Sequence, residues 1–144
     1  ERLYRAYQKE ISLSEGVEEF LDYCKAHNIF IAILTNGRTK SQYAKVIALD
    51  LHRWFDDDHI FISGGIGYQK PDPMAFQYIE KMFSLNPEET WYIGDTYEAD
   101  VVGADGAGWH TVWFNHRNRE RLENCADVTV RSIEELSRFI KERS

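Results

Sequence analysis

The stretch WYIGDTYEAD, residues 91–100, joins an apolar segment to an acidic turn and decides the fold. Its first three residues predict a buried strand that ends at Gly94 and Asp95. Gly94 lets the backbone turn tightly, and Asp100 follows in the first turns of the next helix. A carboxylate directly after a strand suits a hard cation such as Mg²⁺, which prefers oxygen ligands. The alternative is that Asp95 only caps the helix that follows.

Strands and helices alternate on both sides of this stretch. Residues 29–34 are apolar and rich in β-branched side chains, which is typical of a parallel strand buried on both faces. Asp72 and Pro73 are a good helix start. The pattern predicts strands at 29–34, 60–62, 91–93, 110–114 and 128–130, and helices at 15–27, 39–54, from 73, after 95 and near the C-terminus. Alternation of this kind indicates an open α/β sheet, whose ligands bind beyond the carboxyl ends of the strands.

Composition excludes several classes of partner. A length of 144 residues corresponds to one ordinary domain. The net charge of −7 argues against binding to a nucleic acid polymer, which requires clustered lysine and arginine. The longest apolar stretch, 29–34, is far too short to cross a bilayer, so no membrane partner is expected.

The two cysteines, Cys24 and Cys125, do not form a CxxC motif. Cys24 falls on the apolar face of the helix expected at 15–27, so it is expected to be a buried structural thiol. The chain opens without a signal-peptide pattern. Together these features lead us to expect a reducing, cytoplasmic setting.

Thr35, Asn36 and Gly37 follow the strand expected at 29–34. A hydroxyl, an amide and free backbone N–H groups at a strand end suit an anionic oxygen. The alternative is an ordinary turn.

Lys70 lies in the sequence QKPDP, just before the helix that begins at Pro73. Two prolines stiffen the backbone around it. A fixed lysine beside the positive end of a helix could hold a phosphate and stabilise its developing charge. The alternative is a surface lysine.

In this order and at these strand–helix junctions, the motifs resemble the haloacid dehalogenase (HAD) superfamily, from about Ser12 to Asp127. The resemblance implies that Thr35 and Lys70 are catalytic, that Asn36 and Gly37 bind the substrate with them, and that Asp95 and Asp100 serve the metal. It also implies a three-layer, Rossmann-like parallel sheet with helices on both faces.

The acid at Asp95 separates two chemistries within this superfamily. Haloacid dehalogenases proper use no magnesium and usually carry Ser-Asn-type residues where this chain has Gly94-Asp95. The resemblance therefore favours a Mg²⁺-dependent phosphatase, in which an aspartate attacks the phosphorus and a second aspartate protonates the leaving oxygen.

Both of those aspartates belong to the family's first motif, an apolar strand that ends in DxD. The chain contains DxD only at residues 56–58, which do not follow a strand, and an acidic solvated loop is the expected interpretation. Relative to the family, the central first strand and most of the cap are missing. We therefore expect 1–14 to be the end of a cap or linker helix and 15–144 to be an incomplete core. The missing segment of the same protein is then an obligatory partner, without which the sheet has open edges.

Three interpretations of function follow. The first is a phosphatase acting on a small phosphorylated metabolite, with nucleotides among the candidates. The second is a non-catalytic relative, a binding or regulatory module that lacks the nucleophile. A generic nucleotide-binding domain has no support, since the chain has neither GxGxxG nor GxxxxGK[ST].

The segment after the strand expected at 110–114 lies at the same functional edge. Arg117 could contact a substrate there, and Asn115 or Asn118 is expected to begin a helix.

Overall fold

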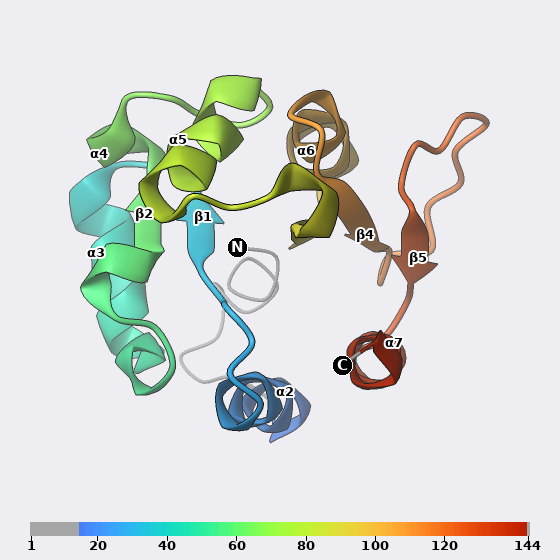
Figure 1. The fold of residues 1–144 in the computed structure, drawn as a ribbon, viewed down its shortest axis with the longest axis horizontal. Coiled ribbons are helices and arrows are strands. Elements are labelled where there is room, and N and C mark those ends of the chain that lie inside the picture. The colour runs from blue at the N-terminus through green and yellow to red at the C-terminus, as the bar shows by residue number, and fades with distance from the viewer. Residues whose placement is uncertain (1–14, 144) are drawn as a thin grey trace. The chain divides into compact units, whose positions relative to one another are not determined.

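The computed structural model describes residues 15–143, and every strand in it pairs in parallel with its neighbours. Among these residues the strands form two sheets, β1–β2 and β3–β4–β5 (Figure 1). The chain divides into two compact units, one ending at Gly67 and one beginning at Tyr68, and each contains one sheet. The predicted α/β fold with parallel strands flanked by helices is thus confirmed. The predicted cap helix at 1–14 lies outside the described residues.

The first unit brings the ends of two strands to one edge. Its elements are α2 (Glu15–Ala26), β1 (Ile33–Thr35), α3 (Thr39–Ala48), η1 (Leu51–Arg53), η2 (Asp57–His59), β2 (Ile60–Ile62) and α4 (Ser63–Ile66). β1 pairs with β2 in a register that sets Thr35 opposite Ile62. The residues that follow the two strands, Asn36 and Ser63, therefore leave the sheet at the same end.

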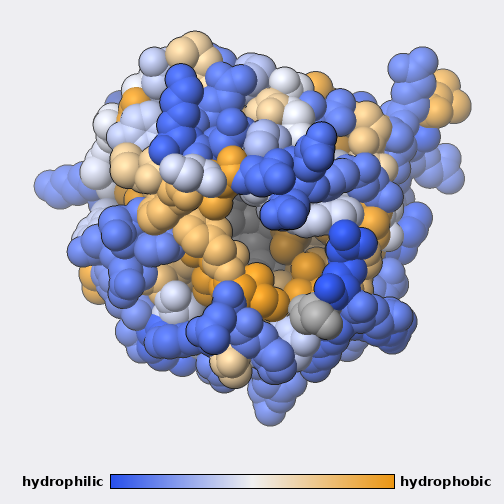
Figure 2. All heavy atoms as spheres, in the orientation of Figure 1, coloured by the Kyte–Doolittle hydropathy of each residue, from blue (hydrophilic) through white to orange (hydrophobic). Residues whose placement is uncertain are grey.

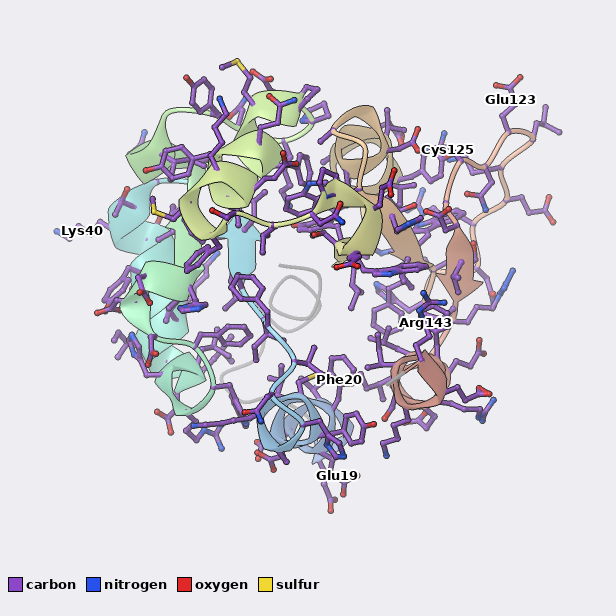
Figure 3. The ribbon with its side chains drawn as sticks, in the orientation of Figure 1. Glu19, Phe20, Lys40, Glu123, Cys125 and Arg143 are labelled. Atoms are coloured by element: carbon purple, nitrogen blue, oxygen red, sulfur yellow. The ribbon has the colours of Figure 1, made fainter. Side chains whose placement is uncertain are left out.

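Helix α2 shows how the apolar pattern builds this unit. Its acidic and apolar residues alternate at helical spacing, so Glu19 and Phe20 point in opposite directions (Figure 3). The buried face consists of Val17, Phe20, Leu21 and Cys24. The prediction of an amphipathic helix with a buried Cys24 is confirmed.

Two predicted boundaries in this unit are wrong. The strand predicted at 29–34 is paired only over Ile33–Thr35, and Phe30 is 45% exposed. The helix predicted at 39–54 ends at Ala48, because Asp50 adopts a left-handed conformation with φ 54° and a 3₁₀ turn follows. Ile47, an apolar residue of this helix, is 55% exposed.

The second unit carries the larger sheet. Its elements are α5 (Pro73–Phe83), η3 (Pro87–Glu89), β3 (Trp91–Gly94), the π-helical η4 (Tyr97–Val102), α6 (Gly103–Gly106), β4 (His110–Phe114), β5 (Val128–Val130) and α7 (Ile133–Arg143). α5 begins as predicted, with Pro73 as its first residue and the Asp72 carboxylate accepting a 2.9 Å hydrogen bond from the Met74 N–H. α6 packs against β4, and α7 packs against β5 (Figure 1).

The register of β3 and β4 aligns their carboxyl ends, since Gly94 lies opposite Trp113. Asp95 and the segment after β4 therefore emerge from the same edge of the sheet. Residues 115–127 form a loop, so the predicted helix start at Asn115 or Asn118 is wrong. Asn115 instead closes the loop, because its amide nitrogen donates to the Arg119 carbonyl and its amide oxygen accepts from the Arg119 N–H.

Polar side chains make up most of the face shown in Figure 2. Within residues 15–143, every helix falls short of the length and apolar character that a bilayer span requires.

Candidate active site

The loop after β1, residues 35–37 (the β1 loop), is held by neutral hydrogen bonds. Thr35 is fully buried, and its hydroxyl accepts a 2.7 Å hydrogen bond from the Gln42 side-chain amide. The Gly37 N–H donates to the Ser63 hydroxyl at 2.8 Å, and the Gly37 carbonyl accepts from the Gly64 N–H at 3.0 Å. The Gly37 N–H, expected to face an anion, is thus bonded within the protein.

Gly37 is required by this arrangement. Its φ of +150° lies in the region that favours glycine, and an added Cβ would lie 2.6 Å from Gln42 Cγ. A side chain at this position would therefore displace the residue that binds Thr35.

Sequence reasoning missed Gln42 and Ser63, which shape the β1 loop. Ser63 directly follows β2, so the rule that singled out Thr35 and Asp95, a polar residue after a strand, would also have found it. Gln42 lies inside α3 with no comparable signal.

Lys70 is buried, with 3% of its surface exposed. Its ammonium donates hydrogen bonds to Asp100 Oδ1 at 2.6 Å and to the Tyr92 hydroxyl at 3.1 Å. Burial of a charge is costly unless the charge is paired and hydrogen-bonded, and Lys70 has both kinds of partner. The alternative of a surface lysine is wrong.

Asp100 is the anion that balances Lys70. It has 0% exposure, and its second oxygen, Oδ2, accepts from the Thr96 N–H at 3.0 Å. The π-helical turn η4 brings Asp100 back over the end of β3. A Cβ on Gly94 would lie 2.2 Å from Asp100 Cβ, so only glycine fits there.

Asp95 lies in the same loop, residues 94–100 (the β3 loop), and its side chain is 1% exposed. Its Oδ2 lies 3.3 Å from His116 Nε2 and 3.3 Å from Arg117 Nη2, while Oδ1 accepts from the Thr96 hydroxyl at 3.2 Å. The N-cap of η4 is Thr96, so the alternative that Asp95 only caps this helix is wrong.

The two basic side chains beside Asp95 differ from Lys70 in exposure. The side chains of His116 and Arg117 are 34% and 49% exposed. Sequence reasoning considered Arg117 as a substrate contact and gave His116 no role, because the Asp95 carboxylate that both side chains approach follows a different strand. The resulting site offers a buried carboxylate, a buried ammonium and two partly exposed basic side chains.

The DxD at residues 56–58 is solvent-exposed, as expected of an acidic loop. Asp56, Asp58 and His59 place potential ligand atoms within 4.8 Å of one another. Hydrogen bonds from His52 and from the Tyr43 hydroxyl lower the pKa of Asp57. These residues precede β2, at the end of that strand opposite Ser63.

The chain is similar to known proteins of one family. The model of the haloacid dehalogenase-like hydrolases matches residues 1–114. The chain is 30% identical to the glyceraldehyde 3-phosphate phosphatase of Pyrococcus furiosus, over 84% of this chain and 51% of that protein. It is 34% identical to the phosphoserine phosphatase of Thermus thermophilus, over 90% and 51%. It is 33% identical to the pyrimidine 5′-nucleotidase YjjG of Escherichia coli, over 78% and 50%.

Solved structures of HAD phosphatases and hydrolases have a fold similar to that of this chain. A HAD phosphatase from Thermococcus onnurineus has a TM-score of 0.78 at 27% identity, over 89% of this chain and 58% of that one. The HAD-hydrolase YfnB of Bacillus subtilis, solved bound to magnesium, has a TM-score of 0.77 at 28% identity, over 95% and 60%. The chain spans about half the length of the curated relatives it matches. By its matched model, its relatives and its fold, the chain belongs to the haloacid dehalogenase-like hydrolase family.

Proposed function

We propose that this chain is part of a Mg²⁺-dependent phosphatase that hydrolyses monoesters of small phosphorylated metabolites. The observation that carries the proposal is the β3 loop, where the buried carboxylate of Asp95 and the buried Lys70–Asp100 pair occur in one unit. A phosphate ester brings two negative charges, and a site that binds it needs fixed cations in a water-poor setting.

Lys70 supplies such a cation. Because its ammonium is fully desolvated and held by Asp100, its position is set before a phosphate arrives. Electrostatic stabilisation by a preorganised charge needs no reorganisation during the reaction. In the β1 loop of the first unit, Thr35 and Asn36 offer polar groups that suit a phosphate oxygen, and Gly37 gives the loop its shape.

Asp95 fits a magnesium ion by its chemistry. It is a carboxylate at the end of a parallel strand, and its neighbours His116 and Arg117 are partly exposed side chains that can move aside. Both oxygens of Asp100 accept hydrogen bonds from Lys70 and Thr96, so Asp100 would serve the metal indirectly. Magnesium, when bound, would neutralise charge on the phosphate. The similarity to YfnB, solved with magnesium, supports this assignment.

The nucleophile in this proposal is an aspartate of the same protein outside residues 1–144. Its carboxylate attacks phosphorus, the bond to the ester oxygen breaks, and a second aspartate protonates that oxygen. Water then attacks the aspartyl-phosphate, which releases inorganic phosphate and restores the carboxylate. The relatives named for glyceraldehyde 3-phosphate, phosphoserine and pyrimidine nucleotides support a small phosphorylated substrate.

The test compares two aspartates in the complete protein that carries this chain. Phosphate release from a panel of monoesters is measured with Mg²⁺ and with a chelator. Asp95→Asn should lower Mg²⁺-dependent turnover by about 100-fold or more, the scale seen when a metal site is disturbed. Asp58→Asn, which makes the same change in the exposed DxD, should leave turnover intact. Equal turnover in the Asp95 variant would refute the assignment, and an inactive parent protein would favour the non-catalytic interpretation.

A further inference from the structure

The Tyr92 hydroxyl is a partner of Lys70 that the reaction scheme above does not use. Tyr92 lies inside β3, is 7% exposed, and accepts a buried 3.1 Å hydrogen bond from the Lys70 ammonium. Its partner strand is β4, where Thr111 lies opposite. The hydroxyl therefore reaches Lys70 from the sheet, whereas Asp100 reaches it from η4.

The ring of Tyr92 is held tightly. Phe76 of α5, with 0% exposure, packs edge-on against it at a centroid distance of 5.0 Å and an angle of 89°. Trp109 contacts both rings, and its indole N–H donates to Glu80 of α5 at 3.0 Å. Buried aromatic rings in such edge-on contacts have little freedom to shift. The hydroxyl is thus presented from a fixed point.

One partner would not fix the ammonium in this way. Lysine has a flexible four-carbon stem and three equivalent N–H donors. A single ion pair to Asp100 Oδ1 sets the distance between the two groups but lets the ammonium swing around that oxygen. A second bond at 3.1 Å from a different element removes this freedom.

We propose that Tyr92 is a positioning residue, which orients the Lys70 ammonium toward the transferred phosphate through its hydroxyl. The role rests on the phosphatase function proposed above. Because charge on the phosphoryl oxygens is redistributed in the transition state, an error in the position of the ammonium should affect turnover more than substrate binding.

The experiment uses Tyr92→Phe in the complete protein, since phenylalanine keeps the ring and its packing and removes only the hydroxyl. We expect kcat to fall about 10-fold, the scale of one hydrogen bond to a charged group, with KM and the unfolding temperature close to those of the parent protein. Orthovanadate, a mimic of the transition state, should bind more weakly by a similar factor, and inorganic phosphate should bind almost as before. Tyr43→Phe is the matched control, because that hydroxyl bonds to Asp57 on an exposed surface, and it should leave all five quantities unchanged.

Lys70→Met separates this inference from the proposed function. If Lys70→Met loses activity while Tyr92→Phe keeps the parent kcat, the positioning role is refuted and the function stands. A loss of kcat in Tyr92→Phe that vanishes at temperatures where the variant is fully folded would also refute the role. If Lys70→Met retains full turnover, the function proposed for Lys70 itself fails.

Discussion

The β1 loop and the β3 loop occupy equivalent places, each at the carboxyl end of a parallel strand, yet their chemistry differs. The β1 loop is built from neutral groups, with Gln42 bonded to Thr35 and Ser63 bonded to Gly37. The β3 loop is built from charged groups, with Asp100 bonded to Lys70 and Asp95 near Arg117. Both stretches contain a glycine that no other residue could replace without displacing a neighbour.

The difference between the two loops predicts which substitutions lower the stability of the protein most. A neutral hydrogen bond contributes about 1 kcal/mol net, so the β1 loop should tolerate the loss of one. Removal of one member of a buried ion pair costs about 3–5 kcal/mol, because the other charge stays desolvated. Loss of a charged partner in the β3 loop should therefore lower stability as well as activity, whereas loss of one hydrogen bond at the β1 loop should lower stability little.

The largest effect is expected for Asp100→Asn. The variant leaves Lys70 buried without its anion and should lower the free energy of unfolding by about 4 kcal/mol. Glu98→Gln in the same helix is the control, because Glu98 pairs with Arg121 at the surface and such pairs contribute less than about 1 kcal/mol. Urea unfolding of the complete protein measures both. Similar losses in the two variants would show that the Lys70–Asp100 pair is not a buried charge.

A second prediction tests the close approach of Asp100 to β3. Gly94→Ala would place a Cβ 2.2 Å from Asp100 Cβ, and overpacking of this kind costs about 3 kcal/mol. Gly106→Ala is the control, since the added Cβ would meet only Pro73 Cγ at an ordinary 3.6 Å. Thermal unfolding should separate the two variants, and an unaffected Gly94→Ala would mean that the β3 loop is loosely packed.

Deprotonation of a buried thiol in the first unit tests how strongly that unit disfavours charge. Burial raises the pKa of the Cys24 thiol from 9.0 to about 11, so the folded protein favours the neutral thiol. The contribution of this group to stability is complete below pH 9 and is lost as the pH rises through 11. The loss is at most about 2.7 kcal/mol, because each pKa unit corresponds to about 1.4 kcal/mol.

Unfolding measured between pH 8 and pH 11 checks this dependence. Cys24→Ala should flatten the decline in stability over that window. Cys125→Ala removes the exposed cysteine and should not change the decline. A decline that survives Cys24→Ala would assign it to other groups.

The smallest effect is expected for a residue that supports the β1 loop from outside it. Ser63→Ala removes the acceptor of the Gly37 N–H and should cost about 1 kcal/mol. Ser41→Ala, whose hydroxyl makes only an exposed 3.3 Å contact with the Arg38 carbonyl, should cost less. A loss of several kcal/mol in Ser63→Ala would remove the contrast between the two loops.

The sequence predicted the parallel α/β fold and the strand ends at Thr35 and Asp95, because these depend on local patterns. The helix predicted at 39–54 was extended six residues beyond its observed end at Ala48, since the left-handed turn at Asp50 has no glycine to mark it. From the sequence, Lys70 could have been either a surface residue or a site residue. The partner that explains its burial, Asp100, lies 30 residues away. Gln42 and Tyr92 were missed for the same reason: a side chain inside a helix or strand reveals its partner only after folding.

Calorimetric titration of the complete protein with Mg²⁺ tests the proposal that Asp95 holds the magnesium ion. We predict that the parent protein binds Mg²⁺ and that Asp95→Asn loses this binding, whereas Asp58→Asn retains it. Binding that survives Asp95→Asn and disappears in Asp58→Asn would refute a magnesium site at Asp95, because the metal would then lie at the exposed DxD before β2.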